Sequence, residues 1–218
     1  MTPVTEALDT QTRQLGAAIR AARLSKALTL VELARLAQLS HPFLSQLERG
    51  HARPSMASLE RIARALETSQ LDLLAGAADL AADDPELLWG PVTVTAGALV
   101  PPARLPRRAE FVRRGEGTIG PYAEGSARLL VGARARFQPM EFTGANVVFG
   151  DFYHHAEDEF VTVVEGRVVV DLSGDGEFVL GCGDSVYFEG GTLHRWRSAG
   201  EGTYRLLIVK QRFQKEQP

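Results

Sequence analysis

The stretch LTLVELARLAQLSHPFLSQLERG, residues 28–50, carries the clearest fold signal in the chain. Its apolar residues recur with the spacing of one helix face, at Leu30, Leu33, Ala34 and Ala37. Thr29 followed three residues later by Glu32 is a capping box, which predicts that a helix begins there. Residues 38–40 interrupt the pattern, and Ser40 is a good N-cap for a second helix. The stretch therefore predicts a helix-turn-helix.

The second helix of this motif, expected over residues 41–49, has two different faces. Its apolar side chains point to one side, at Phe43, Leu44 and Leu47. The opposite side is polar and short, and it consists of Pro42, Ser45, Gln46 and Arg49, with His41 at the N-terminal edge. Such side chains can meet base edges or phosphates, so we expect this helix to enter a DNA major groove. Glu48 lies beside the core face, where we expect it to pair with Arg23 or Arg20.

The helical pattern continues on both sides of the motif, and we expect one helical domain over residues 11–75. Further N-cap candidates stand at Ser55 and Ser69. Residues 1–75 hold 9 Lys and Arg against 7 Asp and Glu, whereas residues 76–218 hold 15 against 20. The small positive surplus of the first part has the sign expected for a domain that meets a polyanion. Its modest size predicts that useful affinity needs two such domains on a palindromic site.

Over residues 15–74 the chain resembles the Xre/Cro-type repressor domain, which is a five-helix bundle that binds double-stranded DNA. The order of Glu48, Arg49 and Gly50, followed by RPS at 53–55, carries this resemblance. It implies base contacts from His41, Pro42, Gln46 and Arg49, and phosphate contacts from Thr29, Ser45 and Arg53. Ser40, at the start of the second helix, joins these DNA-binding candidates.

One residue departs from the family pattern, and two further arginines need an interpretation. Leu30 stands where the family often has a glutamine that holds a phosphate. Arg61 and Arg64 are interpreted as a solvated helix face rather than as DNA contacts. The alternative is a helical bundle that serves only for docking or dimerisation.

The pattern changes after residue 75. Residues 76–108 lose the helical period and contain LVPPARLPRR, so we expect a linker. Residues 109–213 contain short β-branched runs separated by glycine turns, as in EFVTVVEG, RVVVDL and YRLLIVK. This spacing predicts an antiparallel sandwich or barrel. The fold class is therefore α + β with two domains.

The run DFYHHAEDEFVTVVEG, residues 151–166, holds the strongest candidate for a site in this second part. Strand side chains alternate between faces, so parity places His155 with Glu159 and leaves His154 on the other side, unless a bulge reverses it. His194 follows on a later strand. Two imidazoles and a carboxylate are a sufficient set of ligands for one Zn²⁺ or Fe²⁺ with an open coordination position.

This run also resembles the first motif of the cupins, and GDSVYFEGGTLH resembles the second. Tyr153 stands where the first cupin histidine belongs. Because a phenol is a poor ligand unless the metal lowers its pKa, several interpretations stay open. In one interpretation His155, Glu159 and His194 alone bind the metal, and in another Tyr153 is a fourth ligand. Alternatively the same groups form a metal-free effector pocket, or polar residues at a barrel mouth that bind nothing. The expected pocket residues are Tyr153, His155, Glu159, Tyr187, His194 and Trp196.

Taken together, the two halves resemble the Xre–cupin transcriptional regulators. This resemblance implies a homodimer that binds a palindromic operator and whose cupin domain senses a small-molecule effector or a metal ion. We expect that the protein is not an enzyme. The competing interpretation is a metal-dependent dioxygenase or isomerase that carries a DNA-binding head, and a third is a cupin that serves only to dimerise.

The remaining features concern location. Cys182 is the one cysteine, and the N-terminus lacks the basic and apolar regions of a signal peptide. No apolar stretch reaches the roughly 18 residues that span a bilayer. We therefore expect a cytoplasmic protein with no membrane partner.

Overall fold

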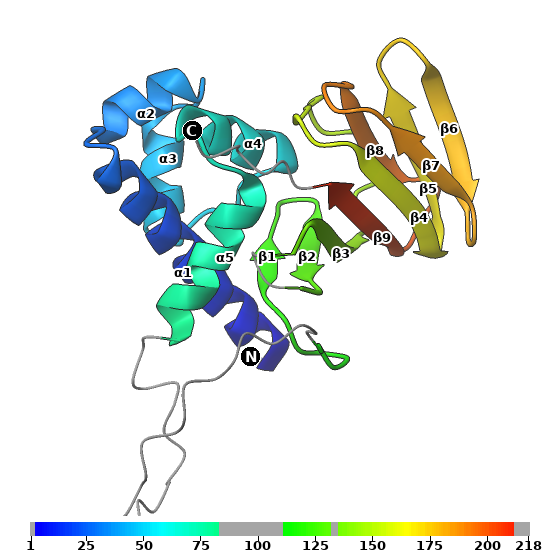
Figure 1. Ribbon diagram of the computed structural model, residues 1–218, viewed down its shortest axis with the longest axis horizontal. Coiled ribbons are helices and arrows are strands. Elements are labelled where there is room, and N and C mark those ends of the chain that lie inside the picture. Colours follow the sequence, from blue (N-terminus) through cyan, green and yellow to red (C-terminus); the bar gives the residue numbers. More distant parts are fainter. Residues whose placement is uncertain (1–2, 83–110, 132–134, 212–218) are drawn as a thin grey trace, which may run out of the picture.

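The computed structural model describes residues 3–82, 111–131 and 135–211. A helical domain and a β-sandwich lie side by side, with α5 and α1 next to the strand β1 (Figure 1). The predicted fold class, a helix-turn-helix bundle followed by an antiparallel β domain, is confirmed.

Five helices form the first domain: α1 (Pro3–Ser25), α2 (Leu30–Leu36), α3 (His41–Glu48), α4 (Met56–Ala65) and α5 (Gln70–Ala82). The predicted caps are confirmed at Thr29, Ser40 and Ser55, whose side chains accept from the backbone of the first helical turn. The capping box is complete, because the Glu32 carboxylate also accepts from the Thr29 amide at 2.8 Å. Within the described part of the chain, no helix is both long and apolar enough to cross a membrane.

The helix-turn-helix of α2 and α3 is held against α1. Leu44 and Leu47 are fully buried, and Gly16 on α1 allows a close approach, since a Cβ there would lie 2.3 Å from the Leu47 carbonyl oxygen. The predicted partner of Glu48 is Arg23, whose guanidinium donates to both carboxylate oxygens at 2.7 and 2.9 Å. This bidentate pair fixes the position of α3 on the bundle.

The domain boundaries differ from the expectation. The helix α5 continues to Ala82, so residues 76–82 belong to the helical domain and not to the linker. The helical period of the apolar residues is lost here, but this stretch is rich in alanine, which favours a helix, and Gly76 packs near Ala18 of α1. Similarly, α1 begins at Pro3 rather than near residue 11. The rest of the expected linker, 83–108, lies outside the described residues.

Within residues 111–131 and 135–211, nine strands form the second domain: β1 (Ile119–Pro121), β2 (Gly125–Leu129), β3 (Phe137–Gly144), β4 (Glu159–Glu165), β5 (Arg167–Leu172), β6 (Gly176–Gly181), β7 (Ser185–Phe188), β8 (His194–Ser198) and β9 (Tyr204–Gln211). One sheet has the order β1-β2-β3-β9-β4-β7 and the other β6-β5-β8, and neighbouring strands are antiparallel. Phe142 and Trp196 meet between the sheets with ring centroids 5.9 Å apart, so the two sheets share one core.

The strand order positions the predicted site. β4 lies inside the larger sheet and β8 at the edge of the smaller one, so Glu159 and His194 approach each other from opposite sheets. Gly166 makes the turn from β4 to β5 with φ of 77°, where a Cβ would lie 2.6 Å from the Thr203 carbonyl oxygen. Only glycine fits this turn without strain.

The helical domain packs directly on the sandwich. The Ala123 amide donates to the Pro54 carbonyl at 2.9 Å, and the buried Tyr122 hydroxyl donates to the Gln70 side chain at 3.0 Å. Leu74 of α5 lies so close to Gly120 that a Cβ there would be 2.5 Å from a leucine methyl. The DNA-binding fold and the β domain therefore share an interface with buried polar and apolar contacts.

Candidate metal centre and DNA-binding face

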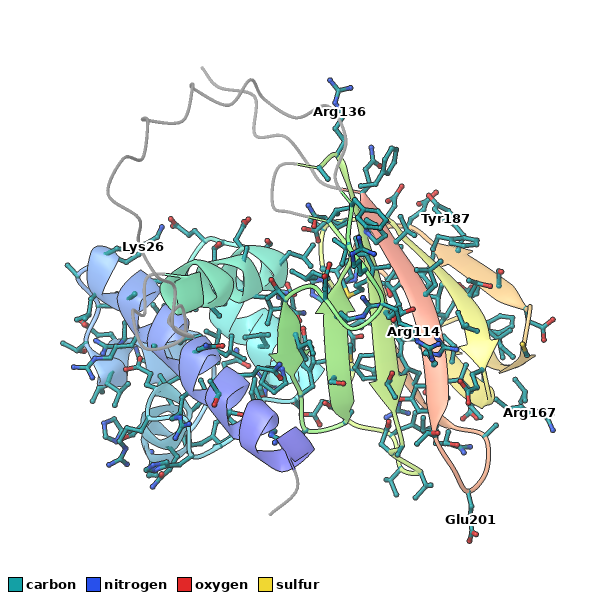
Figure 2. The ribbon with its side chains drawn as sticks, turned by 90° about the horizontal axis from the view of Figure 1, so that it is seen from below. Lys26, Arg114, Arg136, Arg167, Tyr187 and Glu201 are labelled. Atoms are coloured by element: carbon teal, nitrogen blue, oxygen red, sulfur yellow. The ribbon has the colours of Figure 1, made fainter. Side chains whose placement is uncertain are left out.

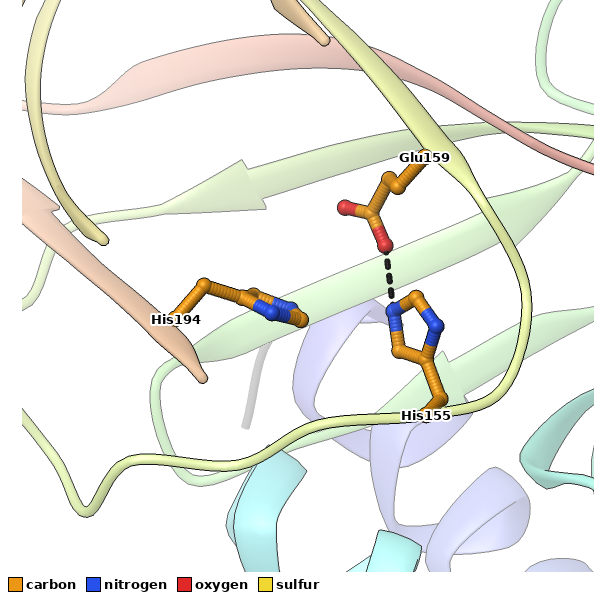
Figure 3. Close-up of side chains that lie close together, drawn as sticks. All are labelled: His155, Glu159 and His194. Atoms are coloured by element: carbon orange, nitrogen blue, oxygen red, sulfur yellow. Dashed lines mark hydrogen bonds and ion pairs between the residues drawn. The ribbon is translucent and has the colours of Figure 1, made fainter. Parts of the chain in front are cut away.

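Three side chains with metal-ligand atoms meet in the sandwich: His155, Glu159 and His194 (Figure 3). Their ligand atoms all lie within 4.8 Å of one another, and all three residues are buried. His155 precedes β4, Glu159 begins it, and His194 begins β8. The structure thus brings together the three residues that strand parity and spacing selected.

The hydrogen bonds of the two imidazoles aim the same nitrogen of each ring at the site. The Nδ1 atom of His194 lies 2.8 Å from the Thr192 carbonyl oxygen, and that of His155 lies 2.9 Å from the Glu157 carbonyl oxygen. A carbonyl only accepts, so Nδ1 of each ring must carry the proton. In the neutral rings the Nε2 lone pairs then face the centre, as metal-binding histidines require.

The protonation states of these side chains also favour metal binding. Burial by itself would raise the pKa of Glu159, but the charge of Lys210 and the hydrogen bond from His155 outweigh it and hold that pKa well below its usual range. Burial lowers the pKa of His194 to about 4. At neutral pH Glu159 is therefore a carboxylate and His194 a neutral imidazole, the forms that bind a metal.

Two atoms of this cluster are buried without a hydrogen-bond partner: Oε1 of Glu159 and Nε2 of His194. Both are acceptors, and a buried acceptor without a partner costs about 1–3 kcal/mol. In addition, Nε2 of His155 lies 2.6 Å from Oε2 of Glu159, so this pair of atoms holds either a shared proton or a cation. These residues therefore fit a divalent ion such as Zn²⁺ or Fe²⁺.

Lys210 is the neighbour of the cluster that we did not predict. Its ammonium lies 3.2 Å from Oε2 of Glu159, and its side chain is 11% exposed. On β9 the inward residues Tyr204, Leu206 and Ile208 are buried, and Lys210 continues their parity. A lysine at an inward position of an apolar strand is the sequence signal that identifies it.

Tyr153 lies beside the cluster, but its hydroxyl is engaged elsewhere. Its backbone forms a bridge with that of His194, and the two rings lie 4.3 Å apart. The hydroxyl donates to the sulfur of Met56 on α4, at 3.5 Å. Burial raises the pKa of Tyr153 well above its usual range. This protonated phenol, turned toward the helical domain, argues against the four-ligand interpretation.

The other two expected pocket residues have different positions. Trp196 is buried and stacks on His194, with ring centroids 5.8 Å apart. The prediction for Tyr187 is wrong, since this side chain lies on the outer surface, 57% exposed, and donates to Asp158 (Figure 2). The register explains the difference: Phe188 pairs with Glu159 and faces inward, so Tyr187 faces outward.

A cleft of about 460 Å³ opens between the helical domain and this end of the sandwich. His154, which parity separates from the cluster, lines it together with His155 and Lys210. Arg64 of α4 also lines the cleft and donates to the His154 carbonyl at 2.9 Å. The interpretation of Arg64 as part of a purely solvated helix face is therefore corrected.

The predicted DNA-binding side chains of α3 share an exposed face. His41, Pro42, Gln46 and Arg49 are exposed, and Ser45 is half-buried. The Arg49 guanidinium donates back to the Ser45 carbonyl at 3.1 Å, and the Gln46 side chain lies 3.2 Å from the His51 ring. The helical domain contacts the sandwich through Pro54, α4 and α5 and not through α3 in these hydrogen bonds. The exposed face of α3 therefore stays open.

The remaining DNA-binding candidates lie around this face. Thr29 and Ser40 are exposed, and each is already used as an N-cap. Arg53 is half-buried in the turn that follows α3. Leu30, where the related domains often have glutamine, packs partly buried against the core.

Two family models match the chain. A helix-turn-helix model matches residues 19–73, which cover α2 to α4 completely, and a cupin domain model matches residues 140–210. The curated polyketide synthase CurC from Streptomyces cyaneus is 31% identical over 80 residues, which are 37% of this chain and 51% of that protein. The match thus spans about half the length of this relative.

Solved structures resemble the chain along most of its length. An HTH_3 family transcriptional regulator from Vibrio cholerae is 20% identical, with a TM-score of 0.61 over 94% of this chain and 99% of that chain. Apo-HppE is also 20% identical, with a TM-score of 0.42 over 91% of this chain and 98% of that chain. The chain therefore carries a helix-turn-helix domain followed by a cupin domain, in the order that the two family models match.

Proposed function

We propose that the protein is a sequence-specific DNA-binding regulator of transcription whose cupin domain binds a metal ion, a small-molecule effector or both. The observation that carries this proposal is the buried cluster of His155, Glu159 and His194, with two unpaired acceptor atoms, beside the interface with the DNA-binding domain. We place its action in the cytoplasm, where the DNA is accessible.

The exposed face of α3 supports the DNA-binding half of the proposal. Gln46 and Arg49 are the side chains best suited to base edges, because an amide recognises adenine and a guanidinium recognises guanine with two hydrogen bonds. With a small positive surplus on the domain, one head binds weakly, so we expect two heads on a palindromic operator.

The loop before β4 supports a coupling between the two halves. Three of its residues touch the helical domain: Asp151 lies 3.9 Å from Arg61, Tyr153 donates to Met56, and the His154 carbonyl accepts from Arg64. The next residue is His155. A ligand that moves His155 therefore moves the docking surface of the head, and it changes DNA affinity if it prefers one arrangement.

A divalent ion would be held by the Nε2 atoms of His155 and His194 and by Glu159. When bound, it would supply a Lewis-acidic centre with open positions for an oxygen ligand. The residues around it would orient that ligand and exclude water, since Trp196 and Phe188 pack on His194.

The outer strands of the sandwich support a homodimer. The edge strand β6 exposes side chains on both faces, among them Phe178 and Val179, which are 40% and 55% exposed. Adjacent apolar residues that point to opposite faces of an edge strand are typical of a strand that a partner covers. We propose that a second copy of the chain covers β6.

The same cluster also suits a second function. Two histidines and a carboxylate that leave coordination positions open are the arrangement of non-haem iron oxygenases. We nevertheless propose that the protein is not an enzyme, because the phenol of Tyr153, beside the cluster, is turned toward the DNA-binding domain and contacts Met56 there. Oxygen uptake by the iron-loaded protein with candidate substrates would identify a dioxygenase instead.

Selection of binding sites from random duplex DNA tests the regulatory function. We expect a palindromic consensus whose half-sites lie about one or two helical turns apart. The affinity for this consensus is then measured with and without added Zn²⁺ or Fe²⁺. Enrichment of no sequence would contradict the proposed function, because the protein would then lack specific DNA recognition.

A further inference from the structure

The cleft between the domains has walls from both of them. The helical domain contributes Glu60 and Arg64 from α4 and Gln70 from α5, whereas the β domain contributes His154, His155 and Lys210. A small cavity farther in, beside Tyr153 and Trp196, measures only about 10 Å³ and holds at most a water molecule. Among the described residues near the cluster, the cleft is therefore the space that can hold a metabolite.

The base of the cleft reaches the candidate metal centre. His155 and Lys210 line the cleft, and both contact Glu159. When a divalent ion is bound, that ion and Lys210 together carry three positive charges against the single negative charge of Glu159. This surplus lies among buried groups, where it is costly unless an anion neutralises it.

The acidic residues of the cleft do not remove this surplus. Glu60 accepts from the Gln70 side chain at 2.8 Å and lies 3.8 Å from Arg64. Glu157 lies 3.4 Å from Nδ1 of His155, on the side of the ring away from Glu159. Glu60 is paired with Arg64, and Glu157 offsets at most one of the three positive charges, so a surplus of positive charge remains at the base.

Arg64 brings hydrogen-bond donors to the same space from the DNA-binding domain, and its charge is paired with Glu60 at 3.8 Å. Its guanidinium makes one hydrogen bond, from Nη2 to the His154 carbonyl, while the side chain is 53% exposed. A guanidinium presents several donors in one plane, and this fork matches the two oxygens of a carboxylate.

We propose that the cleft binds a small metabolite that carries at least one carboxylate, and that the DNA-binding domain forms part of this binding site through Arg64. The proposal deepens the regulatory function proposed above and rests on it. One carboxylate occupies the base near Lys210 and the metal, and Arg64 contacts the ligand from α4. Because the ligand touches both domains, its binding stabilises the docked arrangement of the head relative to any other.

Titration calorimetry on the full-length, Zn²⁺-loaded protein tests this site. The probes are acetate, succinate and 2-oxoglutarate, with acetamide and succinamide as uncharged matches, and the zinc content is measured again after each titration. We expect at least one carboxylate to bind with Kd below about 1 mM and the amides not to bind. Arg64→Ala weakens this binding by at least about tenfold, and Arg64→Lys restores part of it.

Asp151→Asn is the matched control, because it alters the ion pair with Arg61 at the same interface without touching the cleft. It should leave the carboxylate affinity unchanged. Equal affinity in the wild type and in Arg64→Ala, or binding of no carboxylate, would overturn the proposal. Each preparation is also assayed for DNA binding: a protein that binds its operator but no carboxylate refutes the ligand site alone, whereas one that binds no DNA refutes the regulatory function.

Discussion

The two functional regions of this protein are built in opposite ways. The DNA-binding face lies on the eight residues of α3 and the turn after it, and its polar side chains are exposed. The candidate metal centre gathers His155, Glu159, His194 and Lys210 from two sheets, and all of them are largely buried. The first region is local in sequence, whereas the second exists only once the sandwich has formed.

This difference assigns different kinds of work to the two regions. An exposed polar helix face costs little to form and can exchange its water for the edges of bases. A buried set of acceptors is costly until a cation or ligand satisfies it, so its occupancy can bias the structure around it. The interface of α4 and α5 with the sandwich lies between them and connects the two.

The largest expected effect concerns the buried region. We expect His155→Ala or His194→Ala to abolish metal binding, because each removes one of three ligands, whereas His154→Ala leaves the metal content near that of the wild type. Metal analysis after equilibrium dialysis measures the stoichiometry. Equal metal loss in His154→Ala would break the distinction that strand parity draws between the adjacent histidines.

The exposed region should respond next most strongly. Gln46→Ala combined with Arg49→Ala removes two candidate base contacts, and at about 1–3 kcal/mol each the operator affinity should fall by about 100-fold or more. Fluorescence anisotropy with the selected operator measures it, and Arg167→Ala, an exposed arginine of the cupin domain, is the control (Figure 2). An unchanged affinity would mean that α3 is not the recognition helix.

The pH dependence of stability separates the two regions further. The pKa of His194 is about 4 in the folded chain, against 6.5 for an unperturbed histidine, so the unfolded chain takes up this proton first as the pH falls. The metal-free protein should therefore lose about 2 kcal/mol of stability between pH 7 and pH 5 through this residue. Urea unfolding of the wild type and of His194→Gln measures the difference, and identical pH profiles would contradict it.

The smallest of these effects concerns assembly. Val179→Asp places a charge on the exposed edge strand β6, and we expect it to weaken the dimer by about tenfold or more without unfolding the chain. Light scattering over a concentration series measures the dimer, and circular dichroism checks the fold. A wild-type protein that stays monomeric at all concentrations would refute the dimer itself.

The helical domain was largely predictable because its signals are local. The caps at Thr29, Ser40 and Ser55 and the two faces of α3 follow from residues within one or two helical turns. A pairing of Glu48 with Arg23 or Arg20 was also expected, since an acidic residue beside a core face requires a nearby cation, and the structure selects Arg23. The extension of α5 to Ala82 was not predicted, because the apolar residues lose their helical period after residue 75, whereas packing against α1 supports the helix there.

The candidate metal centre was only partly predictable. Parity within one run selects His155 and Glu159, but the inward face of β7 depends on its register with β4, and for this reason Tyr187 was misplaced. Lys210 lies 51 residues beyond Glu159, and Arg64 reaches the site from another domain. The parity of β9 marks Lys210 as an inward residue, but the partners of Lys210 and Arg64 depend on how sheets and domains pack.

The central claim is that occupancy of the cupin domain changes DNA binding. It is tested most directly by the operator affinity of the full-length protein in three states: metal-free, Zn²⁺-loaded, and Zn²⁺-loaded with a saturating carboxylate. We predict that the affinity differs between at least two of these states by about fivefold or more, and that His194→Ala removes the difference. The same affinity in all three states would contradict the claim and leave the cupin as a dimerisation domain.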